Sequence, residues 1–174
     1  TFLGNHDVTR IATQIEDDRH LGHATATLLT LPGTPSIYAG DEQAFTGVKA
    51  DHARGDDAVR PEFPATPDDL LPYGWSTYRR WQELISLRRR HPWLARATVE
   101  VHDLANEAIG YVCTSTDPDD DARLAVLLNL GDQPTAFPEA QQAVPAAKVE
   151  AASFDADEGA TIGEVPPHGW AILA

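Results

Sequence analysis

The sequence predicts an α/β segment followed by an all-β segment, with the change near residue 95. Before that point, apolar residues recur at the three- and four-residue steps of amphipathic helices, separated by stretches rich in turn residues. After it, short apolar runs alternate with Asp, Pro and Gly turns at regular spacing, which is typical of an antiparallel β-domain. We therefore expect two domains, residues 1–95 and residues 96–174.

The first domain is predicted to contain two strand–helix units. Residues 1–3 are expected to end a buried strand, and residues 17–31 to form a helix. Residues 36–39 are expected to form a second short strand, and the polar stretch after it is long enough to be a functional or disordered loop. A second helix is predicted to run from about Ser76, its N-cap, to Arg90.

The second domain is predicted to be an antiparallel β-sandwich. Its strands are expected at residues 97–103, 107–115, 123–130, 134–138, 147–153, 160–165 and 169–174. The run at 123–130 is almost continuously apolar, as expected of a central strand that is covered on both faces. Cys113 lies in an apolar strand and is expected to be buried and inert.

Composition narrows the possible partners. The formal net charge of −14 argues against a nucleic-acid partner, because a phosphate backbone requires Lys and Arg to replace its counterions. An anionic membrane surface is disfavoured for the same reason, whereas a neutral sugar is compatible. A single cysteine fits a reduced compartment, so we favour a cytoplasmic location.

The first domain is expected to be incomplete as it stands. Two parallel strands need neighbours to satisfy their edges and to cover their faces. The chain also begins without an initiator Met or a basic-then-apolar signal pattern. We therefore expect a piece of a larger protein, whose exposed strand edges and apolar helix faces would favour self-association.

Two motifs with a helix between them carry the chemistry. Asn5, His6 and Asp7 follow the first predicted strand in FLGNHDVTR, and LPGTPSIYAGDE surrounds the second. The order and spacing resemble glycoside hydrolase family 13, the α-amylase family, in which FxxNHDxxR follows the seventh barrel strand and PGxPxIYxGxE marks the eighth. The resemblance implies the last two strand–helix units of a (β/α)₈ barrel, which places catalytic groups at the carboxyl ends of its strands.

The resemblance extends over essentially the whole chain and implies a function. FTGVKADHARGDDAVRPEFP is similar to the family's long loop after the eighth strand, and STYRRWQELISLRRRHPWLA to its last barrel helix. The remainder resembles the family's C-terminal β-sandwich, including the closing VPPHGWAIL. The implied parent is a retaining α-glycosidase that acts on α-glucans or maltooligosaccharides.

By the same resemblance, Asp7 matches the carboxylate that stabilises the transition state, and His6 matches a residue that binds sugar hydroxyls. A carboxylate near the anomeric carbon stabilises positive charge as it develops, without a metal or another cofactor. Asn5 is expected to support this group on the substrate side. Arg60 and Trp75 are further candidates for substrate binding.

The catalytic set is expected to be incomplete. Retaining hydrolysis needs a nucleophile and an acid/base carboxylate roughly 5 Å apart. In the family these come from the fourth and fifth strands, whose motifs this sequence lacks. Glu42 is not the proton donor, because the matching family residue follows the eighth strand. The chain alone is therefore expected to be inactive.

Several residues keep two interpretations. Arg10 either orients the Asp7 loop or closes a salt bridge, and the latter is favoured. Asp41 and Glu42 either meet substrate or anchor their loop. The set Asp56, Asp57 and Arg60 either contacts sugar or, as favoured, forms an ion-pair network that shapes the loop. His20 and His23 either bind a metal or, as favoured, lie on a solvated face, and residues 117–121 form a calcium loop or, as favoured, a hairpin turn.

Two rival functions stay open. A sucrose- or trehalose-converting transglycosidase of the same family would share these motifs, because the loops that set specificity come from earlier strands. A carbohydrate-binding or structural β-module without catalysis would use only residues 96–174.

Overall fold

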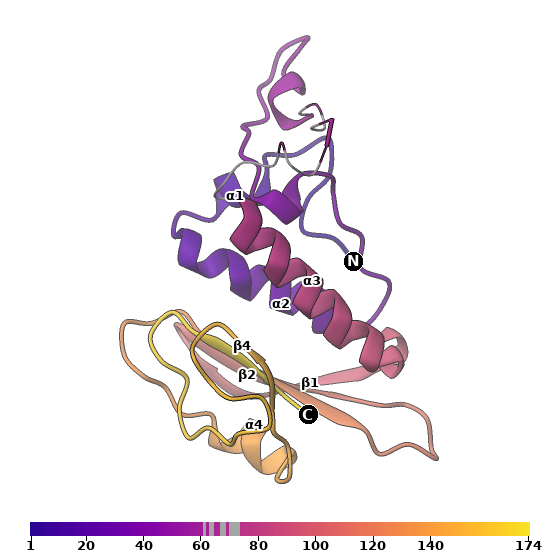
Figure 1. Ribbon diagram of the computed structural model, residues 1–174, viewed down its shortest axis with the longest axis vertical. Helices are drawn as coiled ribbons and strands as arrows, with labels where there is room; N and C mark the ends of the chain where they lie inside the picture. The colour runs from indigo at the N-terminus through magenta and orange to yellow at the C-terminus, as the bar shows by residue number, and fades with distance from the viewer. Residues whose placement is uncertain (61, 63–64, 67–68, 70–73) are drawn as a thin grey trace.

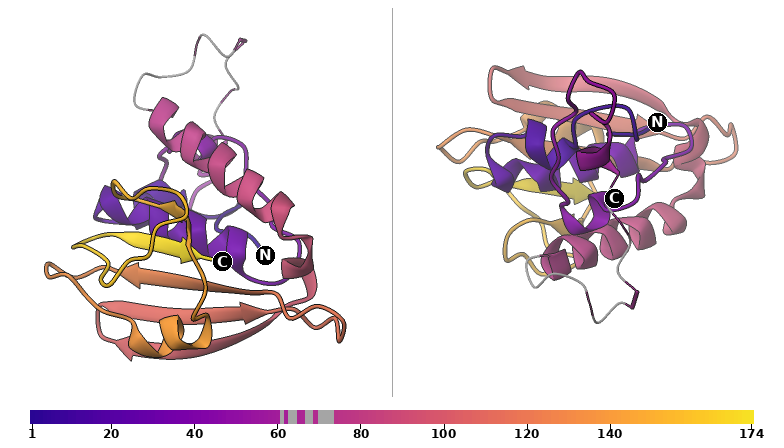
Figure 2. Two further views of the ribbon diagram at one scale, coloured as in Figure 1. Left: turned by 60° about the horizontal axis from the view of Figure 1, so that its bottom comes forward. Right: turned by 90° about the horizontal axis from the view of Figure 1, so that it is seen from above.

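A computed structural model describes residues 1–60, 62, 65, 66, 69 and 74–174. Figures 1 and 2 show two crossing helices, α2 and α3, stacked on one face of an antiparallel sheet, with the short helix α4 and irregular chain on the other face. A third region, made of loops, extends from the end of the helical layer farthest from the sheet (Figure 1).

The first domain contains helices at both predicted places, residues 17–31 and residues 76–90, and further short helical segments. Its helices are α1 (Ile11–Gln14), η1 (Asp18–His20), α2 (Leu21–Thr30), η2 (Asp41–Gln43), η3 (Asp57–Val59), α3 (Gly74–Arg90) and η5 (Pro92–Arg96). α3 begins at Gly74, so Ser76 is its third residue and the prediction of Ser76 as the N-cap is wrong. No helix in the described part of the chain is long and apolar enough to cross a membrane.

The two strands predicted in the first domain are reduced to a single parallel bridge between Phe2 and Ser36. The expectation of a buried strand is wrong for Phe2, whose side chain is 60% exposed. The physical reason is that, in the described ranges, no third strand lies beside this pair to extend its hydrogen bonding or to cover it. The parallel direction of the bridge is nevertheless that of neighbouring barrel strands.

The second domain is built around a five-stranded sheet in which every neighbouring pair is antiparallel. Its strands are β1 (Thr98–Ala105), β2 (Ala108–Thr114), β3 (Arg123–Asn129), β4 (Val149–Ala152) and β5 (Trp170–Leu173), in the order β1-β2-β3-β5-β4. The central strand β3 is buried at every position after Arg123, as its apolar sequence predicts. The antiparallel β-domain is thus confirmed.

Two of the seven expected strands are absent from this sheet. Residues 134–138 and 160–165 meet only at an antiparallel bridge between Thr135 and Val165. The first of these segments leads into α4 (Pro138–Ala143). Phe137 and Val165, one from each segment, are 1% and 0% exposed and pack against the sheet. The layer that the sequence predicts as a second sheet is therefore a short helix with loops.

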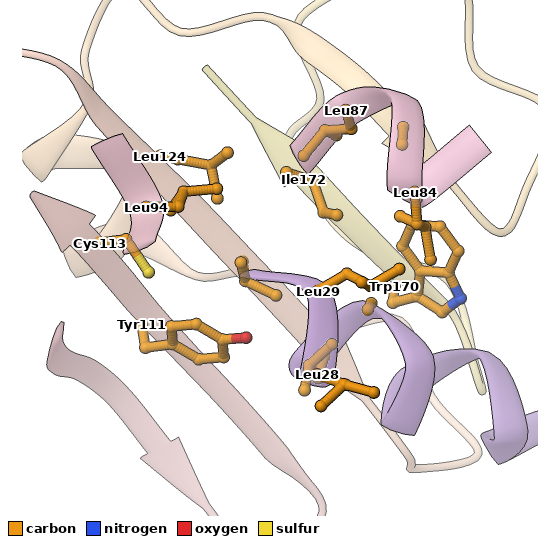
Figure 3. Packing of buried hydrophobic residues seen from close by; sticks show 14 of the residues in the cluster. Leu28, Leu29, Leu84, Leu87, Leu94, Tyr111, Cys113, Leu124, Trp170 and Ile172 are labelled. Atoms are coloured by element: carbon orange, nitrogen blue, oxygen red, sulfur yellow. The ribbon is translucent and has the colours of Figure 1, made fainter. Parts of the chain in front are cut away.

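One apolar core joins the helices to the sheet (Figure 3). Leu28 and Leu29 of α2 and Leu84 of α3 pack with Tyr111 of β2 and Trp170 of β5. Because this cluster draws on both sides of residue 95, the two expected domains share a core, and the boundary between 95 and 96 remains a prediction.

Two tryptophans and the cysteine expected to be buried lie in the same core. Trp81 and Trp170 are 3% and 1% exposed. Cys113 is fully buried, and burial raises the pKa of its thiol to about 12. A thiol that stays protonated is a poor nucleophile, which agrees with the prediction of an inert residue.

Candidate active site

Asp7 lies on an exposed loop that follows the Phe2–Ser36 bridge. Its backbone N–H donates to Asn5 Oδ1 at 2.8 Å, which closes a local turn. His6 Nε2 lies 3.2 Å from Asp7 Oδ2, and both side chains are 60% exposed. The turn therefore presents a carboxylate and an imidazole side by side to solvent.

Arg60 joins this loop to the chain 53 residues further on. Its Nη2 donates to Asp7 Oδ1 at 3.1 Å and to Asp56 Oδ2 at 2.6 Å, and its Nε donates to the His6 carbonyl at 3.2 Å. The structure thus brings together four of the five predicted site residues. Lys49, which is not among the predicted site residues, pairs with Asp56 on the same loop.

The loop that contains Asp56 and Asp57 is held by several ion pairs. Asp57 pairs with Arg54 at 2.8 Å, and Asp56 is shared between Arg60 and Lys49. The favoured interpretation, an ion-pair network that shapes the loop, is confirmed. Within that network Arg60 also donates to Asp7, so one guanidinium connects the network to the candidate catalytic carboxylate.

A buried ion pair joins Arg10, three residues after Asp7, to Asp41. Arg10 Nη1 donates to Asp41 Oδ1 at 2.9 Å and to the Ala39 carbonyl at 2.7 Å, and the guanidinium lies 4.1 Å from the centre of the Tyr38 ring. Arg10 and Asp41 are 1% and 3% exposed. Burial raises the pKa of Asp41, and the Arg10 charge opposes that shift. The favoured structural role of Arg10 is confirmed, and Asp41 is a loop anchor.

Glu42 is also a loop anchor. Its Oε2 accepts from the Gly40 N–H at 2.8 Å, and its Oε1 accepts from Gln43 Nε2 at 2.9 Å. Gly40 has a φ of +96°, and a Cβ there would lie 2.5 Å from the Phe45 ring. The tight turn therefore requires glycine, and it uses the Glu42 carboxylate internally.

Trp75 stands apart from the group around Asp7. It is 36% exposed in the first turn of α3, and its ring makes an edge contact with Tyr78 at 5.8 Å between centroids. Among the described contacts, none joins Trp75 to Asp7, His6 or Arg60. Its predicted role in substrate binding therefore rests on exposure alone.

Two solved enzyme structures contain the fold of this chain as part of a larger protein. The acarbose-soaked debranching enzyme of Nostoc punctiforme matches 99% of this chain and 32% of its own length, with a TM-score of 0.73 and 21% identity. Trehalulose synthase MutB of Pseudomonas mesoacidophila MX-45 matches 99% of this chain and 42% of its own, with a TM-score of 0.69 and 18% identity. The chain has the fold of a barrel end followed by an antiparallel β-domain.

Comparison of the sequence with known proteins identifies the family. Residues 1–70 match the model of the alpha-amylase catalytic domain. An alpha-amylase of Streptomyces lividans is 31% identical over 163 residues, covering 78% of this chain and 17% of the relative. A cyclomaltodextrin glucanotransferase of Bacillus sp. (strain 38-2) is 33% identical over 111 residues, covering 64% and 14%. The chain belongs to the α-amylase family, glycoside hydrolase family 13, and spans a minor part of these relatives' length.

Proposed function

We propose that Asp7 is the transition-state-stabilising carboxylate of a retaining enzyme that acts on α-linked glucose, and that His6 binds the sugar undergoing cleavage. The observation that carries the proposal is the exposed Asp7 carboxylate, oriented by Arg60 at 3.1 Å within the segment that matches the family. Asn5 supports the turn, and Trp75 is a candidate for stacking on a more distant sugar.

The geometry suits this chemistry. As the glycosidic bond breaks, positive charge spreads over the anomeric carbon and the ring oxygen. A carboxylate that is already in place stabilises that charge without reorganisation in the transition state. The Asn5 turn holds the backbone of Asp7 and Arg60 contacts its carboxylate, so together they lower the cost of holding that group in place.

The remaining groups would come from elsewhere in the barrel. The chain spans about one-seventh of the cyclomaltodextrin glucanotransferases it matches, and the family's nucleophile and acid/base motifs are not in its sequence. We propose that the chain alone is inactive. Similarity to glucanotransferases keeps transglycosylation, rather than hydrolysis, as a second candidate.

The test places Asp7 in a complete barrel. The coding sequence upstream of Thr1 is read for the nucleophile and acid/base motifs, and the longer polypeptide is assayed with a chromogenic maltooligosaccharide. We expect Asp7→Asn to lower kcat by at least about 100-fold with little change in folding. Asp51→Asn, an exposed change on the loop after η2, is the matched control. Equal activity of the two variants would contradict the proposal.

A further inference from the structure

A second group of titratable side chains lies where η1 meets the turn before β5. His20 Nε2 lies 3.0 Å from His168 Nδ1, although the two residues are 148 positions apart in sequence. The other nitrogen of His168, Nε2, lies 2.8 Å from Asp132 Oδ1. Asp17, the N-cap of η1, completes the group from the helical side.

His23 does not belong to this group, although it follows His20 by one turn of helix. It is buried, with its Nε2 2.9 Å from the Gly169 carbonyl and 3.0 Å from the Asn129 carbonyl. Burial lowers the pKa of His23, which favours the neutral ring that donates to both carbonyls. The favoured solvated-face interpretation is therefore wrong for His23, and the partner of His20 is His168 instead.

The ligand atoms are close enough to share one ion. One oxygen of Asp17 and one nitrogen each of His20 and His168 lie within 4.8 Å of one another. Two imidazole nitrogens bound to tetrahedral zinc at about 2.0–2.1 Å are roughly 3.3 Å apart. The observed separation of 3.0 Å is only slightly shorter, so a small movement of either ring would admit the ion between them.

The surroundings of His168 are those of a metal-binding histidine. A ligating imidazole almost always donates its remote N–H to a carboxylate or carbonyl, which fixes its tautomer. Asp132 stands at that position. His168 also has a φ of +53°, a conformation that non-glycine residues rarely adopt. Residues held in such strained conformations cluster at functional sites.

Asp17 can serve two partners at once. Its carboxylate accepts from Arg19 Nε at 2.9 and 3.0 Å and from Arg19 Nη2 at 2.5 Å. Asp17 Oδ1 also accepts from the backbone N–H of Arg19 at 3.0 Å. An ionised carboxylate offers about four lone-pair positions, and three N–H groups of Arg19 use most of them, so a metal bond takes the remaining position or replaces the Nε contact that both oxygens share. Two imidazoles, a carboxylate and water make a set that suits zinc-type ions better than calcium or magnesium, which prefer oxygen alone.

We propose that Asp17, His20 and His168 bind a divalent transition-metal ion of the zinc type, with Asp132 orienting His168. The ion would link η1 of the barrel part to the turn that leads into β5, and so lock α2 onto the sheet. This site is separate from the group around Asp7 and does not depend on the proposed function.

Titration calorimetry of the 174-residue chain with zinc chloride at pH 7.5 tests the site. We expect one ion per chain, at least tenfold weaker binding in His20→Ala and in His168→Asn, and about 10–100-fold weaker binding in Asp132→Asn. His168→Asn is chosen because Asn tolerates a positive φ. His102→Ala changes a half-buried histidine of β1 and is the matched control, with unchanged affinity.

Circular dichroism melts in the presence of a chelator check that each variant folds. A folded His20→Ala chain with the zinc affinity of the unmodified chain would overturn the proposal. Cobalt(II) gives a second measurement on the unmodified chain that needs no variant. Strong visible absorption, as from four-coordinate cobalt, supports the site, whereas the weak absorption of a six-coordinate ion overturns it.

Discussion

Different interactions stabilise two regions of this chain. One is the loop end, the loops around Asp7 and Arg60, and the other is the interface between the helices and the sheet. At the loop end, Asp7 and Arg60 are 60% and 46% exposed and are held by polar contacts. At the interface, Leu84 and Trp170 are 0% and 1% exposed in a continuous apolar cluster. Exposed ion pairs contribute at most about 1 kcal/mol, whereas a buried Leu or Trp contributes several. The apolar interface therefore contributes most of the stability of the fold, and the candidate catalytic residues lie at the loop end.

The strongest test of this difference replaces one buried and one partly exposed tryptophan with alanine. We expect Trp170→Ala to lower the free energy of unfolding by about 3–5 kcal/mol, because it leaves a cavity beneath both α2 and α3. Trp75→Ala removes a partly exposed ring and should cost less than about 1 kcal/mol. Urea denaturation measures both, and similar losses would contradict the comparison.

The buried pair of Arg10 and Asp41 is the exception at the loop end. Arg10→Met should lower the free energy of unfolding by about 3 kcal/mol, because it leaves the Asp41 carboxylate buried without its partner. Arg54→Met, which breaks an exposed pair with Asp57, should cost less than about 1 kcal/mol. The double variant Arg10→Met/Asp41→Leu should recover most of the loss. No recovery would show that Arg10 acts through something other than its charge.

The pH dependence of stability should arise partly at the interface. Burial lowers the pKa of His23 in the folded chain, so below about pH 6.5 the unfolded state binds a proton that the folded state does not. His23 should therefore make the chain less stable as the pH falls from 7.5 to 5.5, by at most about 1.4 kcal/mol per pH unit.

Urea denaturation of the unmodified chain and of His23→Gln at both pH values isolates this effect from the other histidines. Glu150 does not contribute in this window. Burial would raise its pKa, but hydrogen bonds from His91 and Arg90 outweigh burial and lower it. The stability that Glu150 provides is therefore lost only as the pH falls through values below its ordinary pKa of about 4.3. An identical slope in the two chains would contradict the assignment to His23.

The smallest effect concerns association. We propose that the chain self-associates through exposed apolar side chains of the first domain, of which Phe2 and Val48 are each 60% exposed. Phe2→Ser/Val48→Ser should weaken association by about tenfold in sedimentation equilibrium. Leu104→Ser removes a side chain that is 78% exposed on the edge strand β1. If this change, and not the double variant, separates the chains, the surface that carries Phe2 and Val48 is not the contact.

The parts of the fold that depend on local spacing could be predicted from the sequence. The three- and four-residue steps that include Leu21 and Leu28 correspond to α2, and the apolar run at 123–130 corresponds to β3. The two runs that failed as strands contain Phe137 and Val165, which are buried as their apolar character suggests. Apolar character predicts burial in short runs, but it does not decide whether the backbone joins a sheet.

The candidate site likewise has a part that could be predicted from the sequence and a part that could not. Asn5, His6 and Asp7 are adjacent in sequence, so their motif could be recognised directly. The contact from Arg60 to Asp7 spans 53 residues and the contact from His20 to His168 spans 148. Neither has a periodicity that a single sequence reveals, and only the fold brings those side chains together.

Amide hydrogen exchange of the isolated chain tests the division between the two ends most directly. We expect the slowest amides of α2 and α3 to exchange with free energies within about 1 kcal/mol of those of β3 and β5, because one core holds all four elements. Amides of residues 1–9 and 46–60 should exchange much faster. Exchange from α2 and α3 at free energies at least about 2 kcal/mol below those of the sheet would show that the helices open separately, and would contradict a shared core.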